Sequence, residues 1–123
     1  FDMVNIAKPN PAIYLKAIKV SGINPTETII IEDSVVGVKA GIAANIKVIG
    51  ITSGGHWIGR SQQLLLNAGA YAVAYDFNEM LEIDNIQAIS FVFSTSYNNI
   101  PSSRVVFLKD ISSDGFIFFT EMY

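Results

Sequence analysis

The sequence contains no cysteine, so neither disulfide bonds nor thiolate-bound zinc can hold this fold together. No apolar run approaches the roughly 18 residues that a membrane-spanning helix needs, and no signal-peptide pattern opens the chain. Charge is scarce as well: 15% of residues are charged, the net charge is −3, and no basic stripe suggests nucleic acid. These absences predict a cytoplasmic protein without nucleic-acid or membrane partners.

The hydrophobic content is high. Half of the 123 residues are hydrophobic, which is enough to bury a core and argues against a disordered chain. The length suits one modest domain or pieces of two. Because the first residue is Phe1 rather than Met, we expect the chain to begin inside a longer protein.

Up to about residue 84, helix and strand signals alternate along the chain. Pro11 suits the first turn of a helix, and Gly22 suits the position just past its end. The further elements expected are strands over 28–31, 47–52 and 70–74 and helices over 35–44, 61–67 and 78–83. Short connections between them predict an α/β fold, a partial Rossmann-like parallel sheet with flanking helices.

The pattern changes beyond this point. Three β-rich runs, 91–96, 104–109 and 116–120, are separated by the turn signals "NNIP" and "SSDG". They predict a short antiparallel β meander, which we interpret as part of a split barrel. The chain is therefore expected to contain two units, residues 1–84 and residues 85–123.

Two adjacent carboxylates, Glu32 and Asp33, stand where the first buried strand stops. In a parallel sheet, ligands collect beyond the carboxyl ends of the strands, and the N-terminus of the following helix favours an anion. Two oxygen ligands beside an anion site could hold Mg²⁺. The alternative interpretation is that Asp33 caps the helix, a role that Ser34 could also take, and that Glu32 is its solvated neighbour.

Lys8 precedes Pro9 at the start of the first expected helix, where a cation gains nothing from the helix dipole. A nearby anion explains this position better, although a solvated surface lysine is the simpler alternative. His56, in "SGGHW", is a conceivable proton carrier or an ordinary loop residue. Trp57 beside it is more typical of a packing residue than of a substrate platform.

Together, "KPNPAIYLKAIKVSG" and "TIIIEDSVVGVKAGIAANIKVIGIT" resemble the C-terminal half of haloacid-dehalogenase-like phosphatases of the phosphoglucomutase/phosphatase subgroup, with the resemblance running to about residue 82. The resemblance implies that Lys8 is catalytic and steadies the phosphoryl group. It implies that Glu32 and Asp33 hold Mg²⁺, with Asp33 as the more direct ligand. Ser34 and Gly37 complete the matching "EDSxxG" segment and would support the phosphate and metal site.

The same family uses an aspartate nucleophile in a DxD segment, and no DxD occurs here. The six aspartates of the chain are Asp2, Asp33, Asp76, Asp84, Asp110 and Asp114. We expect the nucleophile to precede Phe1 in the complete protein, a Mg²⁺-dependent phosphatase that hydrolyses a small phosphorylated metabolite through an aspartyl-phosphate. The chain alone is expected to be inactive, because positioned carboxylate attack is the reaction.

The segment "IPSSRVVFLKDISSDGFIFFTEMY" resembles the N-terminal strands of the pyridoxamine 5'-phosphate oxidase family, an FMN-binding split barrel, over residues 88–123. The resemblance implies FMN as a second cofactor of the complete protein and a homodimer through these strands. The implied FMN-binding residues are Arg104, Val105, Val106, Phe107, Leu108, Lys109, Phe119 and Thr120. In a regular strand Arg104 and Lys109 leave opposite faces, so only a bulge, a strand end or the dimer geometry would bring both to one ligand.

Three hypotheses for function follow. The first is the phosphatase segment already described, fused to the beginning of a flavin oxidase. The second is a fragment of an FMN-dependent pyridoxine or pyridoxamine phosphate oxidase in which the phosphatase part is degenerate or regulatory. The third is a non-catalytic interaction module that exposes strand edges to a partner. Separately, the alternative to the FMN-binding strands is an ordinary hairpin with Arg104 and Lys109 solvated and Asp114-Gly115 as its turn.

Overall fold

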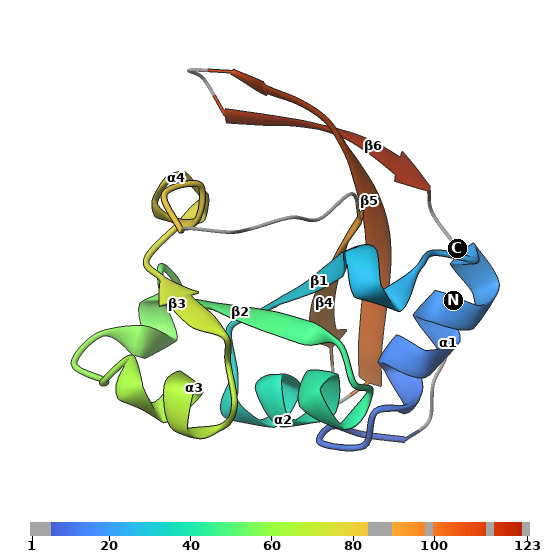
Figure 1. Cartoon of the computed structure of the whole chain (residues 1–123). Coiled ribbons are helices and arrows are strands. Elements are labelled where there is room, and N and C mark those ends of the chain that lie inside the picture. The colour runs from blue at the N-terminus through green and yellow to red at the C-terminus, as the bar shows by residue number, and fades with distance from the viewer. Residues whose placement is uncertain (1–5, 84–89, 98–99, 113–114, 122–123) are drawn as a thin grey trace.

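The computed structural model describes residues 6–83, 90–97, 100–112 and 115–121, and in these ranges the strands form one sheet (Figure 1). The order across the sheet is β3-β2-β1-β4-β5-β6. The strands are β1 (Thr28–Glu32), β2 (Lys47–Ile51), β3 (Ala72–Ala74), β4 (Ser90–Tyr97), β5 (Ile100–Ser112) and β6 (Gly115–Glu121).

The first three strands are parallel, as the alternation of strands and helices predicts. β1 pairs with β2 so that Ile31 lies opposite Ile49, and β2 pairs with β3 so that Ile51 lies opposite Ala74. Every residue of β1 is buried, which is typical of an inner strand of a parallel sheet with both faces covered. The predicted α/β fold with a parallel sheet and flanking helices is confirmed.

The helices lie close to their predicted positions. They are α1 (Ala12–Ser21), α2 (Val35–Ala43), α3 (Gln63–Asn67) and α4 (Phe77–Met80), with 3-10 turns η1 (Pro25–Glu27) and η2 (Gly55–Trp57). Gly22 is the C-cap of α1, as predicted, and Pro11 is its N-cap, one position before the first turn predicted to contain it. Within the described ranges, no helix has the length and apolar character needed to cross a membrane.

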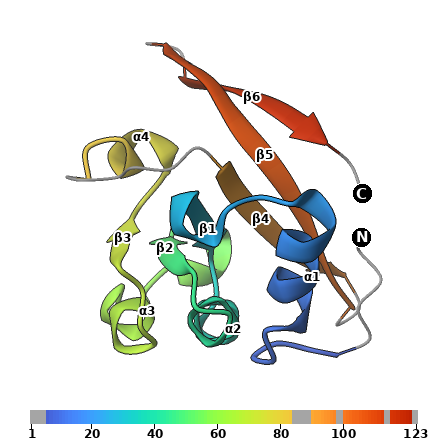
Figure 2. The same cartoon turned by 45° about the vertical axis from the view of Figure 1, so that its right-hand side comes forward.

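The core forms between the parallel strands and the helices. α2 packs against β1 and β2, α3 lies against β3 beside α2, and α1 approaches α2 and β5 (Figure 2). The core cluster includes Ile13 and Ala17 from α1, Val38 from α2 and Ile30 from β1. This packing brings the start of α1 close to the carboxyl end of β1, where the two carboxylates stand.

The C-terminal strands continue the same sheet. β4 runs parallel to β1, while β5 is antiparallel to both β4 and β6 (Figure 1). The register of β5 on β6 shifts between Leu108 and Asp110, so Lys109 is the extra residue of a bulge. The turns predicted around 98–99 and 113–114 and the predicted junction at 84–85 lie outside the described residues. The two-unit division and the partial split barrel stay predictions.

Candidate functional site

A buried carboxylate stands at the carboxyl end of β1. Glu32 is the last residue of that strand and is 2% exposed. Its Oε1 accepts hydrogen bonds from Lys8 Nζ at 2.5 Å and from the Tyr14 hydroxyl, and its Oε2 accepts from Ser34 Oγ at 3.3 Å. A buried carboxylate is tolerated only when it is paired and hydrogen-bonded, and these three donors meet that requirement.

Two of these donors come from the N-terminal segment. Lys8 precedes α1 through a cis peptide bond to Pro9, and its side chain is only 10% exposed. Tyr14 lies on the buried face of α1 and is fully buried. A buried tyrosine needs a partner for its hydroxyl, and the Glu32 carboxylate supplies one. The start of α1 therefore places an ammonium and a hydroxyl on one oxygen of Glu32.

The N-terminus of α2 approaches the other oxygen of Glu32. Ser34 is the N-cap of α2, and its Oγ accepts a hydrogen bond from Gly37 N at 3.0 Å. The Glu32 carboxylate lies directly against Gly37, where any Cβ would overlap it. Glycine at this position thus allows the helix to start over the carboxylate. The predicted support roles of Ser34 and Gly37 toward phosphate and metal remain predictions.

Asp33 points the other way. Its side chain is 57% exposed, whereas that of Glu32 is 1% exposed. The Asp33 carbonyl oxygen accepts a hydrogen bond from Trp57 Nε1 at 2.6 Å, and His56 Nε2 lies 3.1 Å from the same oxygen. The same histidine nitrogen lies 3.8 Å from Asp33 Oδ2. The η2 turn therefore contacts Asp33, while the Asp33 carboxylate faces outward.

These contacts decide between the alternatives that the sequence left open. The interpretation of Asp33 as helix cap and Glu32 as a solvated neighbour is wrong, because Ser34 is the cap and Glu32 is buried. The interpretation of Lys8 as a solvated surface lysine is wrong as well, because Lys8 pairs with Glu32. As expected of a packing residue, Trp57 belongs to the core cluster.

The arrangement bears on the expected Mg²⁺. Mg²⁺ keeps several waters and takes one or two carboxylate oxygens, so the exposed Asp33 carboxylate fits it. Both oxygens of Glu32 already accept hydrogen bonds from protein donors, so Glu32 fits a supporting role better than a direct ligand role. No cluster of three or more His, Cys, Asp or Glu side chains suited to a metal occurs among the described residues.

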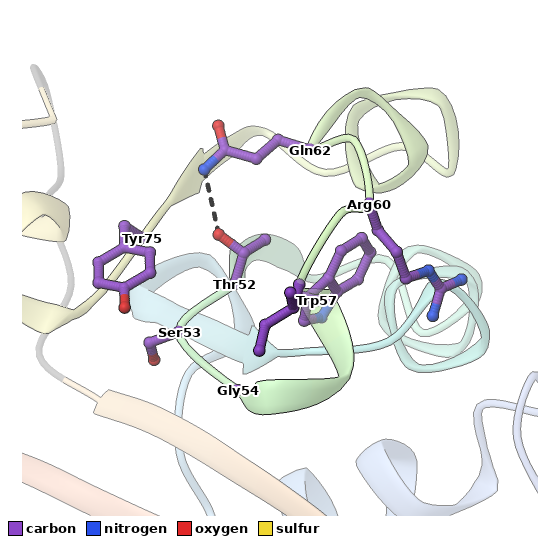
Figure 3. A pocket seen from close by; sticks show the side chains of 8 residues that line it. Thr52, Ser53, Gly54, Trp57, Arg60, Gln62 and Tyr75 are labelled. Atoms are coloured by element: carbon purple, nitrogen blue, oxygen red, sulfur yellow. Dashed lines mark hydrogen bonds between the residues drawn. The ribbon is translucent and has the colours of Figure 1, made fainter.

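A hollow of about 240 Å³ lies beside this region, beyond the ends of β2 and β3 (Figure 3). Thr52 and Gln62 close one part of it through a hydrogen bond of 3.1 Å between Gln62 Nε2 and Thr52 Oγ1. The full lining is Thr52, Ser53, Gly54, Trp57, Ile58, Arg60, Gln62 and Tyr75. Trp57 is thus both a wall of this hollow and the donor to Asp33.

Comparisons with known proteins find similarity over the N-terminal segment. Residues 1–51 match the model of the haloacid dehalogenase-like hydrolase family, and this range contains Lys8, Glu32 and Asp33. Residues 1–51 are therefore similar to a segment of the haloacid dehalogenase-like hydrolases, in agreement with the resemblance inferred from the sequence.

Particular relatives agree with that class. A bifunctional riboflavin kinase/FMN phosphatase of Arabidopsis thaliana is 48% identical over 52 residues, which are 42% of this chain and 14% of that protein. A hydrolase structure from Pseudomonas syringae superposes with a TM-score of 0.56 at 30% identity, covering 65% of this chain and 36% of that one. A HAD family hydrolase structure from Deinococcus radiodurans, with bound phosphate and sodium, superposes with a TM-score of 0.53 at 36% identity. The match covers 59% of this chain and 32% of that one. The chain spans a minor part of each of these relatives.

The expected flavin site receives no support from these comparisons. The family model ends at residue 51, before the C-terminal strands. The side chains in question lie outside what the structure describes; they belong to Arg104, Val105, Val106, Phe107, Leu108, Lys109, Phe119 and Thr120. FMN binding and a homodimer through these strands stay predictions.

Proposed function

We propose that this chain provides the lysine and acidic part of a Mg²⁺-dependent phosphatase site. In the complete protein, that site would hydrolyse the phosphate monoester of a small metabolite through an aspartyl-phosphate. The single observation that supports this most strongly is the buried Lys8–Glu32 pair at the carboxyl end of β1, where the next residue, Asp33, has an exposed carboxylate. The phosphate bound to the related Deinococcus hydrolase and the phosphatase named among the Arabidopsis relatives agree with this class of substrate.

Each residue has a distinct part in this proposal. Asp33 would hold the metal, and bound Mg²⁺ would neutralise negative charge on the phosphoryl group. Lys8 has three N–H donors, so its bond to Glu32 leaves others for phosphoryl oxygens. Glu32 fixes the position of the ammonium and keeps it next to the end of the strand. Because no DxD nucleophile occurs in the sequence, we expect no turnover by this chain alone.

Calorimetric titration with Mg²⁺, in the presence of inorganic phosphate, tests the proposal. The chain should bind the metal, and Asp33→Asn should weaken binding at least about tenfold by removing a charged oxygen ligand. Since Asp33 is exposed, the substitution should leave the melting temperature nearly unchanged.

The matched control is Glu82→Gln, which removes another exposed carboxylate in a distant part of the chain and should leave Mg²⁺ binding intact. Equal Mg²⁺ affinity for Asp33→Asn and the unsubstituted chain would reject Asp33 as the ligand. Absence of any binding heat in the unsubstituted chain would reject the metal site itself.

A further inference from the structure

The η2 turn, Gly55–Trp57, lies in the connection that follows β2 and contacts the main chain of Asp33. Trp57 Nε1–H donates to the Asp33 carbonyl oxygen at 2.6 Å, across 24 residues of sequence. His56 Nε2 lies 3.1 Å from the same oxygen, and since a carbonyl can only accept, a hydrogen bond there requires the proton on Nε2. Two ring nitrogens therefore converge on one peptide group.

That peptide group lies at the junction between a strand and a helix. Asp33 stands between the end of β1 at Glu32 and the N-cap of α2 at Ser34, so its carbonyl belongs to neither element. The main-chain conformation of Asp33 sets the direction of its Cα–Cβ bond, and so the positions that its carboxylate can reach. A hydrogen-bond donor that is packed in the core would keep this main-chain conformation fixed, whereas a mobile donor would not.

Trp57 is such a fixed donor. It is 5% exposed, is part of the core cluster, and its own backbone N–H bonds to Gly54 O at 2.9 Å. The Arg60 guanidinium lies 4.9 Å from its ring, and the side chains around it line the hollow described above (Figure 3). His56 is less constrained, since its side chain is 48% exposed.

Gly54 allows the turn to take this shape. A Cβ at Gly54 would lie 2.8 Å from His56 Cε1 and 2.9 Å from His56 Nδ1, closer than side-chain atoms normally approach. Glycine at this position of "SGGHW" therefore leaves room for the imidazole to fold back over the turn and lie near Asp33. The "SGGHW" loop thus contacts Asp33 through the side chains of Trp57 and His56.

We propose that Trp57 is a positioning residue for Asp33: its indole N–H fixes the peptide between β1 and α2 so that the Asp33 carboxylate faces the metal. The proposal rests on the proposed function, because it assigns Asp33 as the metal ligand. It adds the connection after β2 to a site that the sequence motifs had limited to Lys8, Glu32 and Asp33 and their neighbours. His56 contributes to the same contact from the exposed side.

The chain has a single tryptophan, so tryptophan analogues change only this position. Replacement by 3-benzothienylalanine keeps the ring shape and removes the N–H donor, whereas 5-fluorotryptophan keeps the donor and is the matched control. We expect the benzothienyl chain to bind Mg²⁺ roughly five- to tenfold more weakly, as the loss of one hydrogen bond implies. The fluorotryptophan chain should bind with the affinity of the unsubstituted chain.

A second measurement needs no substitution at Trp57. The indole N–H gives one nuclear magnetic resonance signal, and Mg²⁺ should shift it in the unsubstituted chain but not in Asp33→Asn. This readout keeps the proposal testable if the benzothienyl chain does not fold, because an indole signal that Mg²⁺ leaves unmoved would overturn it.

The outcomes separate the two proposals. Equal Mg²⁺ affinity for the benzothienyl and fluorotryptophan chains, with a lower melting temperature for the former, would mean that Trp57 only packs, and would overturn this inference alone. Absence of Mg²⁺ binding in the unsubstituted chain would overturn the proposed function, and this inference with it.

Discussion

Lys8 Nζ lies 2.5 Å from Glu32 Oε1, and both side chains are almost completely buried, at 10% and 1% exposure. The two residues are separated by 24 positions and come from different elements of the fold. An ion pair withdrawn from water depends on both partners, because either one alone is a buried charge without compensation. The pair therefore ties the N-terminal segment to the end of β1.

Lys8→Met should destabilise the fold strongly. The substitution keeps the length of the side chain and leaves the Glu32 carboxylate buried without a cation, at a cost of about 3–5 kcal/mol. Urea denaturation followed by circular dichroism measures this loss. The control is Lys19→Met, which removes an exposed lysine from α1 and should change the free energy of unfolding by less than about 0.5 kcal/mol.

The double variant Lys8→Met with Glu32→Gln tests whether the loss comes from the unpaired charge. Removing both charges should restore part of the stability, with a coupling of at least about 1 kcal/mol between the two sites. Strictly additive losses would show that Lys8 stabilises the fold by packing alone.

The sequence predicts the elements of this site better than their contacts. β-branched residues over 28–31, with Pro11 and Gly22 at the ends of a helix, fix strand and helix locally, so their positions could be predicted. The anion beside Lys8 could be predicted too, because a cation gains nothing at the start of a helix.

The contacts of Tyr14 and Trp57 could not be predicted in the same way. The bond from Tyr14 to Glu32 depends on how α1 passes the end of β1, and local patterns carry no information on that angle. The contact of Trp57 with Asp33 depends on a 3-10 turn in another strand connection. A buried tyrosine indicates that some partner exists, although not which one.

Tyr14→Phe isolates the hydroxyl contribution. The ring stays in the core, but Glu32 Oε1 loses one donor, which should cost about 1.5–3 kcal/mol, the range for hydrogen bonds to charged groups. Tyr75→Phe, at a ring that is 57% exposed, is the control and should be neutral within about 0.5 kcal/mol. Equal unfolding midpoints for the two variants would contradict the role assigned to the Tyr14 hydroxyl.

Substitutions of Ser34 separate capping from charge. Ser34→Ala removes the cap of α2 and should cost about 1 kcal/mol, and Ser34→Asn should recover most of that loss. Ser34→Asp is also a good cap in general, but its carboxylate would stand next to Glu32 Oε2, which the Ser34 hydroxyl now contacts at 3.3 Å. We therefore expect Asp to be less stable than Asn here, as thermal unfolding of the three variants will measure. If the Asp variant were more stable than the Asn variant, the Glu32 charge would have no effect on the residue at the N-cap.

Gly37→Ala tests whether the helix start needs to lie against the Glu32 carboxylate. In an exposed helix this substitution would stabilise by about 1 kcal/mol, because alanine has the higher helix propensity. At Gly37 the added methyl group overlaps the Glu32 carboxylate, so Glu32 or α2 must move. Overpacking of this kind costs about 1–3 kcal/mol, and the shift would also disturb the bond between Lys8 and Glu32. We expect a net loss of stability in urea denaturation.

Gly55→Ala is the matched control, because a Cβ there meets nothing within 4 Å, and it should be nearly neutral. A Gly37→Ala chain as stable as the control would show that Glu32 can leave its buried position without loss, which the pairing with Lys8 and Tyr14 does not allow.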